Sequence, residues 1–325
     1  MKHIFIVNPA AGKGTALEFV PKIKEYFSQN EADYKIIYTE YAGHATEIAR
    51  EYSSGAPARI YSVGGDGTVN EVVNGIAGTQ SVLGVIPAGS GNDFIRSIDN
   101  NLDAKKLLID TIEGEARRID LGRVNEKFFI NISSIGFDAE VVYNAMKFKR
   151  IPLVPASLAY LFSIIYTCFK RKISEVSLNI DGQLYDKSLL LAAVANGRFY
   201  GGGMLPLPEA ELSDGLFDIC LVDKVSRRLI ISFFPKYIKG THGSMKQVKF
   251  MKAQNVHIKS NDMLCVNIDG EITTSKEVTF EILQGAIRVI YPASLGRSET
   301  SSENIASTIN EGREELLEDR ERIEA

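Results

Sequence analysis

The first third of the chain alternates between short apolar runs and longer segments whose apolar residues recur at helical spacing. Strand-like runs such as "HIFIVNP", "YKIIYTE", "RIYSVGG" and "SVLGVIPAGS" are separated by helical patterns such as "TALEFVPKIKEYF", "GHATEIAREYSS" and "TVNEVVNGIAG". Strict alternation of this kind is typical of a parallel sheet that is covered by helices on both faces. The pattern therefore predicts an α/β domain over residues 1–122.

From about residue 116 the pattern changes to short strands bounded by Gly, Asn or Asp. Helical patterns at 137–148, 155–170 and 226–240 interrupt these strands, which include "EVSLNIDGQLY", "LFDICLVDK", "EVTFEILQG" and "AIRVIYP". The alternation of this part predicts a second, mostly antiparallel β-rich domain over 123–282. The polar, acidic residues 297–325 are typical of a loose tail.

Length, charge and cysteine content narrow the class of protein. The chain has 325 residues, which predicts two domains, and a formal net charge of −4. Without an overall basic field we expect no nonspecific binding to nucleic acid. Cys168, Cys220 and Cys265 are scattered without CxxC spacing, and the N-terminus shows no signal peptide. Both features indicate a reduced, cytoplasmic chain without a zinc knuckle.

One apolar segment, "LAYLFSIIYTCF" at 158–169, is shorter than the roughly 20 residues of a membrane-spanning helix. Basic clusters flank it at 147–150 and 170–172. The segment is either a buried helix or an apolar element that touches an anionic membrane surface.

The loops "NPAAGKGT", "TEYAGHA", "GGDGT" and "PAGSGND" each follow one of the four predicted strands of the first domain. Ligands bind at this edge of a parallel sheet.

The first loop is not a P-loop, because Gly14 occupies the position of the Ser or Thr that follows the lysine. Bare amides before a helix favour phosphate, which Asp66 would repel unless Mg²⁺ lies between them. The alternative is that Asp66 is a plain helix cap.

Two further acidic motifs lie in the second domain. Asp269 and Glu271 stand two positions apart in "NIDGEIT", so an extended chain would direct both carboxylates to one face. "DG" also favours a hairpin turn, which would present both carboxylates at the tip of a loop. A general base needs such a carboxylate near the attacking hydroxyl. Asp214 and the carbonyls of "SDGL" are either ligands of a hard cation or a solvated turn.

The ordered set "VNPAAGKG", "GGDGTVNEVVNG", "PAGSGNDF", "SIGFDAEV", "NGRFYGGGM", "SDGLFDI" and "IDGE" closely resembles the diacylglycerol kinase catalytic family, in its bacterial soluble lipid kinase branch. The likeness covers about residues 1–295. It implies a nucleotide domain and a β-rich lipid domain with the active site in the cleft between them. It also implies that the last strands, at 283–296, return to the first domain. The implied reaction transfers the γ-phosphoryl group of Mg-ATP to a lipid hydroxyl, giving phosphatidic acid from diacylglycerol.

The resemblance also implies roles for individual residues. Glu271 matches the base that deprotonates the lipid hydroxyl, with Asp269 as its catalytic neighbour. Asp66 would serve the Mg²⁺–ATP complex, and Asp93 and Asp120 match acidic positions that support it. Asp214 and the Leu216 carbonyl match a second, structural Mg²⁺ site. The positions that would hold ATP are Asn8, Pro9, Ala10, Ala11, Gly12, Thr39, Gly65, Asp66, Gly67, Thr68, Val69, Asn70, Glu71 and Ser90.

Two other functions stay open from the sequence. "GGDGT" together with "DGE" is compatible with an NAD kinase, and a nucleotide- or lipid-binding regulator without catalysis is a third alternative. The expected partner is a lipid substrate at the inner face of the membrane, where the cytoplasmic protein would bind peripherally. A homodimer is an open alternative.

Overall fold

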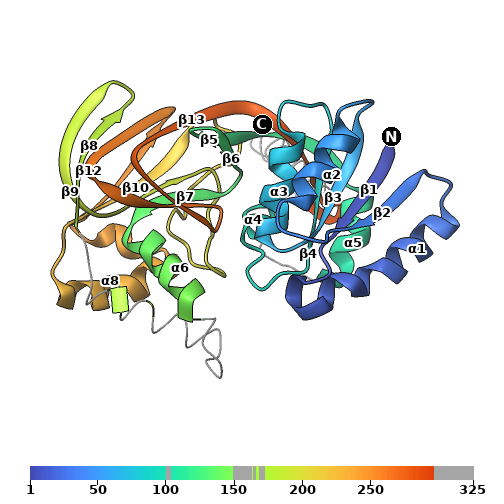
Figure 1. The fold of residues 1–325 in the computed structure, drawn as a ribbon, viewed down its shortest axis with the longest axis horizontal. Helices are drawn as coiled ribbons and strands as arrows, with labels where there is room; N and C mark the ends of the chain where they lie inside the picture. The colour runs from blue at the N-terminus through green and yellow to red at the C-terminus, as the bar shows by residue number, and fades with distance from the viewer. Residues whose placement is uncertain (100–103, 149–162, 164–165, 168–172, 296–325) are drawn as a thin grey trace, which may run out of the picture.

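The computed structural model describes residues 1–99, 104–148, 163, 166–167 and 173–295, and they form two lobes (Figure 1). We call the part from β1 to α5 the N-terminal lobe. Its elements are β1 (Lys2–Val7), η1 (Ala11–Glu18), α1 (Phe19–Gln29), β2 (Tyr34–Tyr38), α2 (His44–Ser53), β3 (Ala58–Gly64), α3 (Asp66–Ile76), β4 (Val82–Pro87), α4 (Asp93–Ile98) and α5 (Ala104–Glu113).

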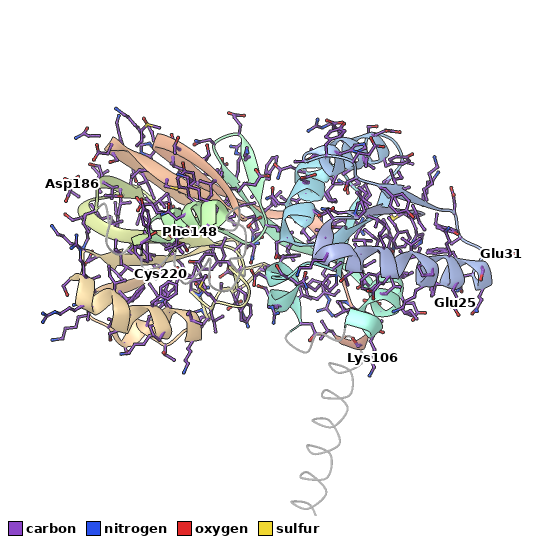
Figure 2. All side chains as sticks on the ribbon, turned by 60° about the horizontal axis from the view of Figure 1, so that its bottom comes forward. Glu25, Glu31, Lys106, Phe148, Asp186 and Cys220 are labelled. Carbon is purple, nitrogen blue, oxygen red and sulfur yellow. The ribbon has the colours of Figure 1, made fainter. Side chains whose placement is uncertain are left out.

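The part from β6 to β12 is the C-terminal lobe, and β5 and β13 run along both lobes (Figure 1). The elements of this half are β5 (Glu115–Val124), β6 (Lys127–Phe129), β7 (Ile132–Gly136), α6 (Phe137–Phe148), β8 (Ser174–Ile180), β9 (Gln183–Ala195), β10 (Phe217–Asp223), α8 (Arg227–Lys239), η2 (His242–Ser244), β11 (Val248–Ala253), β12 (Asn255–Ile268) and β13 (Glu271–Tyr291). Figure 2 shows the exposed side chain of Asp186 at the edge of this lobe and the buried Cys220 within it.

The strands of the N-terminal lobe pair in parallel in the order β2, β1, β3, β4. Successive side chains of β1 point to opposite faces of this sheet. Ile4 and Ile6 pack in the cluster that also contains α2 and α3, whereas Phe5 and Val7 pack with α1 and α5. Helices therefore cover both faces of the sheet. The C-terminal ends of the parallel strands lie together at one edge of the sheet, and each strand continues there into a loop.

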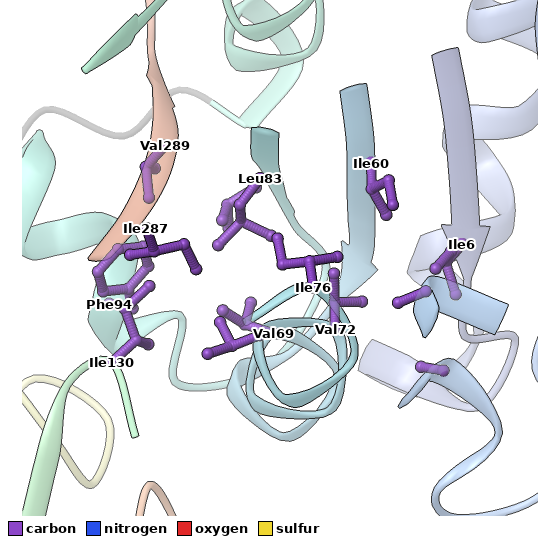
Figure 3. Close-up of a cluster of buried hydrophobic side chains, with 14 of the residues drawn as sticks. Ile6, Ile60, Val69, Val72, Ile76, Leu83, Phe94, Ile130, Ile287 and Val289 are labelled. Atoms are coloured by element: carbon purple, nitrogen blue, oxygen red, sulfur yellow. The ribbon is translucent and has the colours of Figure 1, made fainter. Parts of the chain in front are cut away.

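Strand β13 joins the two lobes. It pairs with β12 and β5, and its late residues Arg288 and Val289 pair in parallel with β4. The sequence predicts two strands here, separated at Gly285. The structure has one strand, whose register shifts between Leu283 and Ile287 around that glycine. Figure 3 shows Ile287 and Val289 of β13 in the core cluster that also contains Leu83.

The sheet of the C-terminal lobe is antiparallel, with β10, β9, β7 and β12 as neighbours. Two of the three predicted helices are confirmed, as α6 (Phe137–Phe148) and α8 (Arg227–Lys239). Most of the third, 155–170, lies outside the described residues. No helix within the described residues is long and apolar enough to cross a membrane.

Candidate active site

Glycines bring the loops after β1, β3 and β4 into backbone contact at the edge of the parallel strands. A methyl group on Gly12 would lie 2.1 Å from the carbonyl oxygen of Ala88, and one on Gly89 would lie 2.5 Å from the Cα atom of Gly65. Side chains at these positions would force the three loops apart. The sequence therefore builds a surface of bare backbone at this edge.

The N-terminus of α3 lies in the middle of this surface. Its first helical bond runs from the Val69 N–H to the Gly65 carbonyl at 3.1 Å, so the amides before it are not used by the helix. The hydroxyl of Thr68 accepts a hydrogen bond from Nδ2 of Asn8 at 3.0 Å, and Oδ1 of Asn8 accepts one from the Ala10 N–H at 3.0 Å. Asn8 thus fixes the first loop against the first turn of α3, where the helix dipole favours an anion.

Asp66 stands at the first position of α3, but its carboxylate serves the neighbouring helix. Its Oδ1 atom accepts the N–H groups of Asp93 at 2.7 Å and Phe94 at 3.3 Å, which begin α4. A methyl group on Gly91 would lie 2.7 Å from Oδ2 of Asp66. No residue that the structure describes donates a hydrogen bond to Oδ2, so this oxygen can take a cation. A carboxylate of this kind, completed by phosphate oxygens, fits the ligands of Mg²⁺.

Asp93 links the two lobes. Its buried carboxylate accepts the N–H groups of Gly202 at 2.8 Å and Gly203 at 2.7 Å. Burial and then the charge of Asp66 raise the pKa of Asp93 to about 6, although the two amides and Arg96 oppose the rise. Both glycines have positive φ angles, of 88° and 105°, which let their amides converge on one carboxylate.

The "DGE" motif forms a tight hairpin between β12 and β13. Asp269 and Gly270 are its turn residues, with φ angles of 46° and 96°. The carboxylate of Asp269 is turned inward and accepts the N–H groups of residues 130, 131 and 132 at 2.8–3.2 Å. It also accepts Nδ2 of Asn70 from α3 at 3.1 Å. Burial raises the pKa of Asp269 to about 6 in spite of these bonds.

The expectation that the hairpin presents both carboxylates together is wrong. The tight turn places the Asp269 carboxylate among the backbone amides, whereas the side chain of Glu271 is 47% exposed. Oε2 of Glu271 lies 3.0 Å from Nζ of Lys127, which is itself 56% exposed. Asp269 therefore anchors the hairpin, and Glu271 is the carboxylate that a substrate can reach. Nothing in the sequence marks Lys127 as its partner, because 144 positions separate the two residues.

Among the described residues, Asp120 makes no hydrogen bond to the loops after β1, β3 and β4. It is 1% exposed, and its two carboxylate oxygens accept the N–H groups of Gly215 at 2.6 Å and Gly285 at 2.8 Å. These bonds join β5 to the loop before β10 and to the register shift of β13. Both oxygens thus accept backbone amides, and the support of Mg-ATP that the resemblance implies for Asp120 stays a prediction.

The remaining predicted ATP residues differ in what their side chains do. Val69 is buried in the core, and Asn70 is 5% exposed and bonded to the Phe128 carbonyl at 3.2 Å as well as to the hairpin. Oε2 of Glu71 accepts the Ala45 N–H at the start of α2 at 3.1 Å. These three side chains are engaged in the scaffold, which leaves the backbone amides of the turn and Thr68 for the predicted nucleotide contacts.

The other members of the set lie on the loops of the same edge. The N–H of Thr39 donates to the Val7 carbonyl at 2.9 Å, which places it beside the first loop. Ser90 is exposed in the loop after β4. Pro9, Ala10 and Ala11 lead from β1 into η1, and Pro9 and Ala11 are half-buried.

Asp214 already has a cation. Its Oδ2 atom lies 2.6 Å from Nζ of Lys252, and its Oδ1 atom accepts the Leu216 N–H at 3.1 Å. The hydrogen bond to Asp214 raises the pKa of Lys252, so the ammonium stays charged. No group of three His, Cys, Asp or Glu side chains suited to a metal ion occurs among the described residues. As it stands, the Asp214 loop does not fit a divalent ion.

Comparison with known proteins gives this geometry a family. The diacylglycerol kinase catalytic domain matches residues 2–124, and a C-terminal domain described as "NAD kinase beta sandwich-like" matches residues 131–291. The chain is 30% identical over 290 residues to a diacylglycerol kinase of Bacillus subtilis, covering 88% of this chain and 95% of that one. It is 29% identical over 298 residues to one of Mycobacterium tuberculosis, covering 88% and 94%.

A solved structure shows the same likeness. The crystal structure of a diacylglycerol kinase from Bacillus anthracis superimposes with a TM-score of 0.65 at 25% identity, covering 90% of this chain and 97% of that one. The two matched domains confirm the predicted two-domain architecture with an antiparallel second domain.

Proposed function

Because the chain belongs to the diacylglycerol kinase catalytic family, and is therefore a lipid kinase, we propose that it phosphorylates diacylglycerol with Mg-ATP in the cleft between its lobes. One observation carries the proposal. Asn70 of α3 donates to Asp269 at 3.1 Å, and this bond ties the helix that begins with Asp66 to the hairpin that carries Glu271. The bare backbone surface at the start of α3 and the hairpin with the exposed carboxylate are thus joined by a direct hydrogen bond, which supports a common role.

The nucleotide is held mainly by backbone. Bare amides at the N-terminus of α3 and the adjoining glycine loops would bind its phosphates, and Thr68 would add a hydroxyl that Asn8 orients. Asp66 would hold Mg²⁺ through Oδ2, since its Oδ1 atom is fixed by the amides of α4. When bound, Mg²⁺ would supply neutralisation of the phosphate charge, which together with positioning dominates phosphoryl transfer.

Glu271 would act as the general base at the lipid. The hydroxyl oxygen of diacylglycerol attacks the γ-phosphorus, the bond from that phosphorus to the ADP oxygen breaks, and the hydroxyl proton passes to Glu271. The buried bonds of Asp269 hold the hairpin at a fixed position for this transfer. Lys127 orients the carboxylate of Glu271 at 3.0 Å before the lipid binds.

We also propose that the C-terminal lobe meets the anionic inner face of the membrane. Of the basic clusters, Lys147 lies within the described residues, and it and Tyr143 are exposed neighbours on α6. An exposed tyrosine beside a lysine is a typical pair at a membrane surface. Residues 149–150 and 170–172 lie outside the described residues.

Charge reversal at both basic clusters should weaken binding to anionic vesicles at low salt. Unchanged binding would exclude this surface.

The experiment measures phosphate transfer from labelled ATP to diacylglycerol in mixed micelles. Asp66→Asn should reduce turnover by orders of magnitude, because the carboxylate that would bind Mg²⁺ is lost. Glu271→Gln should spare ATP binding and abolish turnover, because an amide cannot accept the proton. Asp33→Asn, at a surface ion pair, is the matched control and should behave as the wild type.

Three results would count against the proposal. Near-normal turnover of either active-site variant would remove the assigned role of that carboxylate. Phosphorylation of NAD in a parallel assay, without phosphorylation of diacylglycerol or extracted lipids, would favour the NAD kinase alternative. ATP binding without transfer to any of these acceptors would indicate a regulator.

A further inference from the structure

The loop of Asp214 in the C-terminal lobe is where the family resemblance implies a structural metal ion. That ion would use the Asp214 carboxylate and the Leu216 carbonyl. In this chain Oδ1 of Asp214 is taken by the Leu216 N–H at 3.1 Å and Oδ2 by Nζ of Lys252 at 2.6 Å. Both oxygens of the expected ligand therefore have partners within the protein.

The position of Lys252 follows from strand register. Strands β10 and β11 are antiparallel, and Asp218 lies directly opposite Lys252 across this pair. Nζ of Lys252 lies 3.5 Å from Oδ2 of Asp218, whose side chain is only 12% exposed. One ammonium thus stands between the carboxylates of Asp214 and Asp218. A cross-strand partner of this kind is fixed by the sheet, unlike a lysine on a mobile loop.

The loop is held from its other side as well. Gly215, which follows Asp214, has a φ angle of 77° and donates its N–H to the buried Asp120 at 2.6 Å. The carboxylate of Asp214 is therefore presented to β11 by a backbone that is fixed at both sides. A second cation at the same oxygen would have to displace the ammonium.

We propose that the ammonium of Lys252 is the built-in cation of the Asp214 loop, and that this chain binds no divalent metal there. The ammonium donates a hydrogen bond to Asp214 and places a positive charge 3.5 Å from Oδ2 of Asp218. Mg²⁺ demands near-octahedral oxygen ligands and loses its water reluctantly, so it competes poorly with a cation that the sheet has already placed. The inference concerns the C-terminal lobe alone and does not depend on which substrate is phosphorylated.

A metal ion could reach this site from solvent. A cavity of about 1030 Å³ opens beside the pair and is lined by both Asp218 and Lys252. Glu209 and Glu211 also line it and Arg198 opposes them, so with Asp218 the acidic side chains of the lining outnumber the basic ones once Lys252 is removed. Removal of the ammonium should therefore expose oxygen ligands that Mg²⁺ or Ca²⁺ can reach from solvent.

The test follows thermal unfolding of the full chain without nucleotide, in EDTA and in millimolar Mg²⁺ or Ca²⁺. All variants carry Asp66→Asn, so that metal binding at the proposed active site does not contribute. With Lys252 intact, the midpoint should be the same in EDTA and in metal. Lys252→Met, which keeps the aliphatic stem, should lower the midpoint in EDTA by about 2–4 °C for each kcal/mol lost. Metal should restore the loss.

Lys246→Met removes another exposed lysine before β11 and should leave the midpoint unchanged, with or without metal. Two outcomes overturn the proposal. One is a metal-dependent rise in the protein with Lys252 intact that Asp214→Asn abolishes. The other is a Lys252→Met midpoint in EDTA equal to that of the parent. If Lys252→Met does not fold, crystals of the Lys252-containing chain soaked in Mn²⁺ decide the matter, because anomalous density at Asp214 refutes the proposal and its absence supports it.

Discussion

Substitution of Asp120 separates a structural carboxylate from a catalytic one. The side chain is 1% exposed, and its two oxygens accept the amides of Gly215 and Gly285. In Asp120→Asn one oxygen remains, and the new NH₂ group faces an amide that also donates. The cost of one buried amide without an acceptor is about 1–3 kcal/mol. In Asp120→Ala both amides lose their acceptor, so the cost doubles to about 2–6 kcal/mol.

Equilibrium unfolding in urea near neutral pH measures these losses as shifts of the midpoint at constant slope. Asp33→Asn is the control, because Asp33 is 70% exposed and its pair with Lys2 should contribute less than about 1 kcal/mol. Phosphate transfer is then measured well below the unfolding midpoint and normalised to folded protein. We expect folded Asp120→Asn to retain near-normal turnover, since the carboxylate bonds only to backbone amides among the described residues.

The opposite result would refute the reasoning. If Asp120→Asn is as stable as the wild type and loses phosphate transfer, the carboxylate takes part in the chemistry. Its bonds to the two glycine amides would then be incidental. The sequence alone could not have made this distinction, because an acidic residue within a strand is compatible with either role.

Three further predictions test other parts of the site. Gly12→Ala should raise the KM for ATP and lower stability, because its methyl group would lie 2.1 Å from the Ala88 carbonyl oxygen; an unchanged KM would show that the loop contact is not needed. Lys127→Met should lower turnover, because the carboxylate of Glu271 loses the partner that orients it, while the unfolding midpoint stays nearly unchanged because the pair is exposed; unchanged turnover would separate the lysine from the base. Burial raises the pKa of Asp138 to about 6, so the folded state binds the proton of this carboxyl more tightly than the unfolded state does. The protonated carboxyl therefore contributes to stability in full below about pH 4, and this contribution is lost as the pH rises through 6. Asp138→Asn should therefore become more stable relative to the wild type from about pH 4 to pH 7, and urea midpoints that run parallel over this range would contradict the assignment.

Local signals account for the parts of the fold that the sequence predicts well. The helical pattern at 226–240 contains α8, which runs from Arg227 to Lys239. Ser226 caps it by accepting the Leu229 N–H at 3.3 Å, and Gly240 ends it with a φ angle of 71°. Both boundaries depend on residues that directly flank the helix, so they can be predicted from the local sequence.

Long-range contacts account for the parts that it predicts less well. Gly285 marks a break in the pattern of β13, yet the strand continues because Asp120 accepts the amide of this glycine from 165 positions away. Asp269 is likewise turned inward by amides at 130–132, more than 130 positions before it. The sequence motifs single out both carboxylates, but the groups that they contact come from distant parts of the chain and are brought to them only by the folded sheet.

The acidic residues of the site divide by how many of their oxygens the protein itself occupies. Asp93, Asp120 and Asp269 have both oxygens bonded to backbone amides, so they fix loops and strands. Asp66 keeps Oδ2 without a donor among the described residues, and Glu271 is held by a single exposed lysine. A carboxylate takes a cation or a proton most readily where an oxygen has no donor or only an exposed, exchangeable partner. The chemistry that we propose for this site therefore falls on Asp66 and Glu271, whereas the other three carboxylates fix the loops and strands around them.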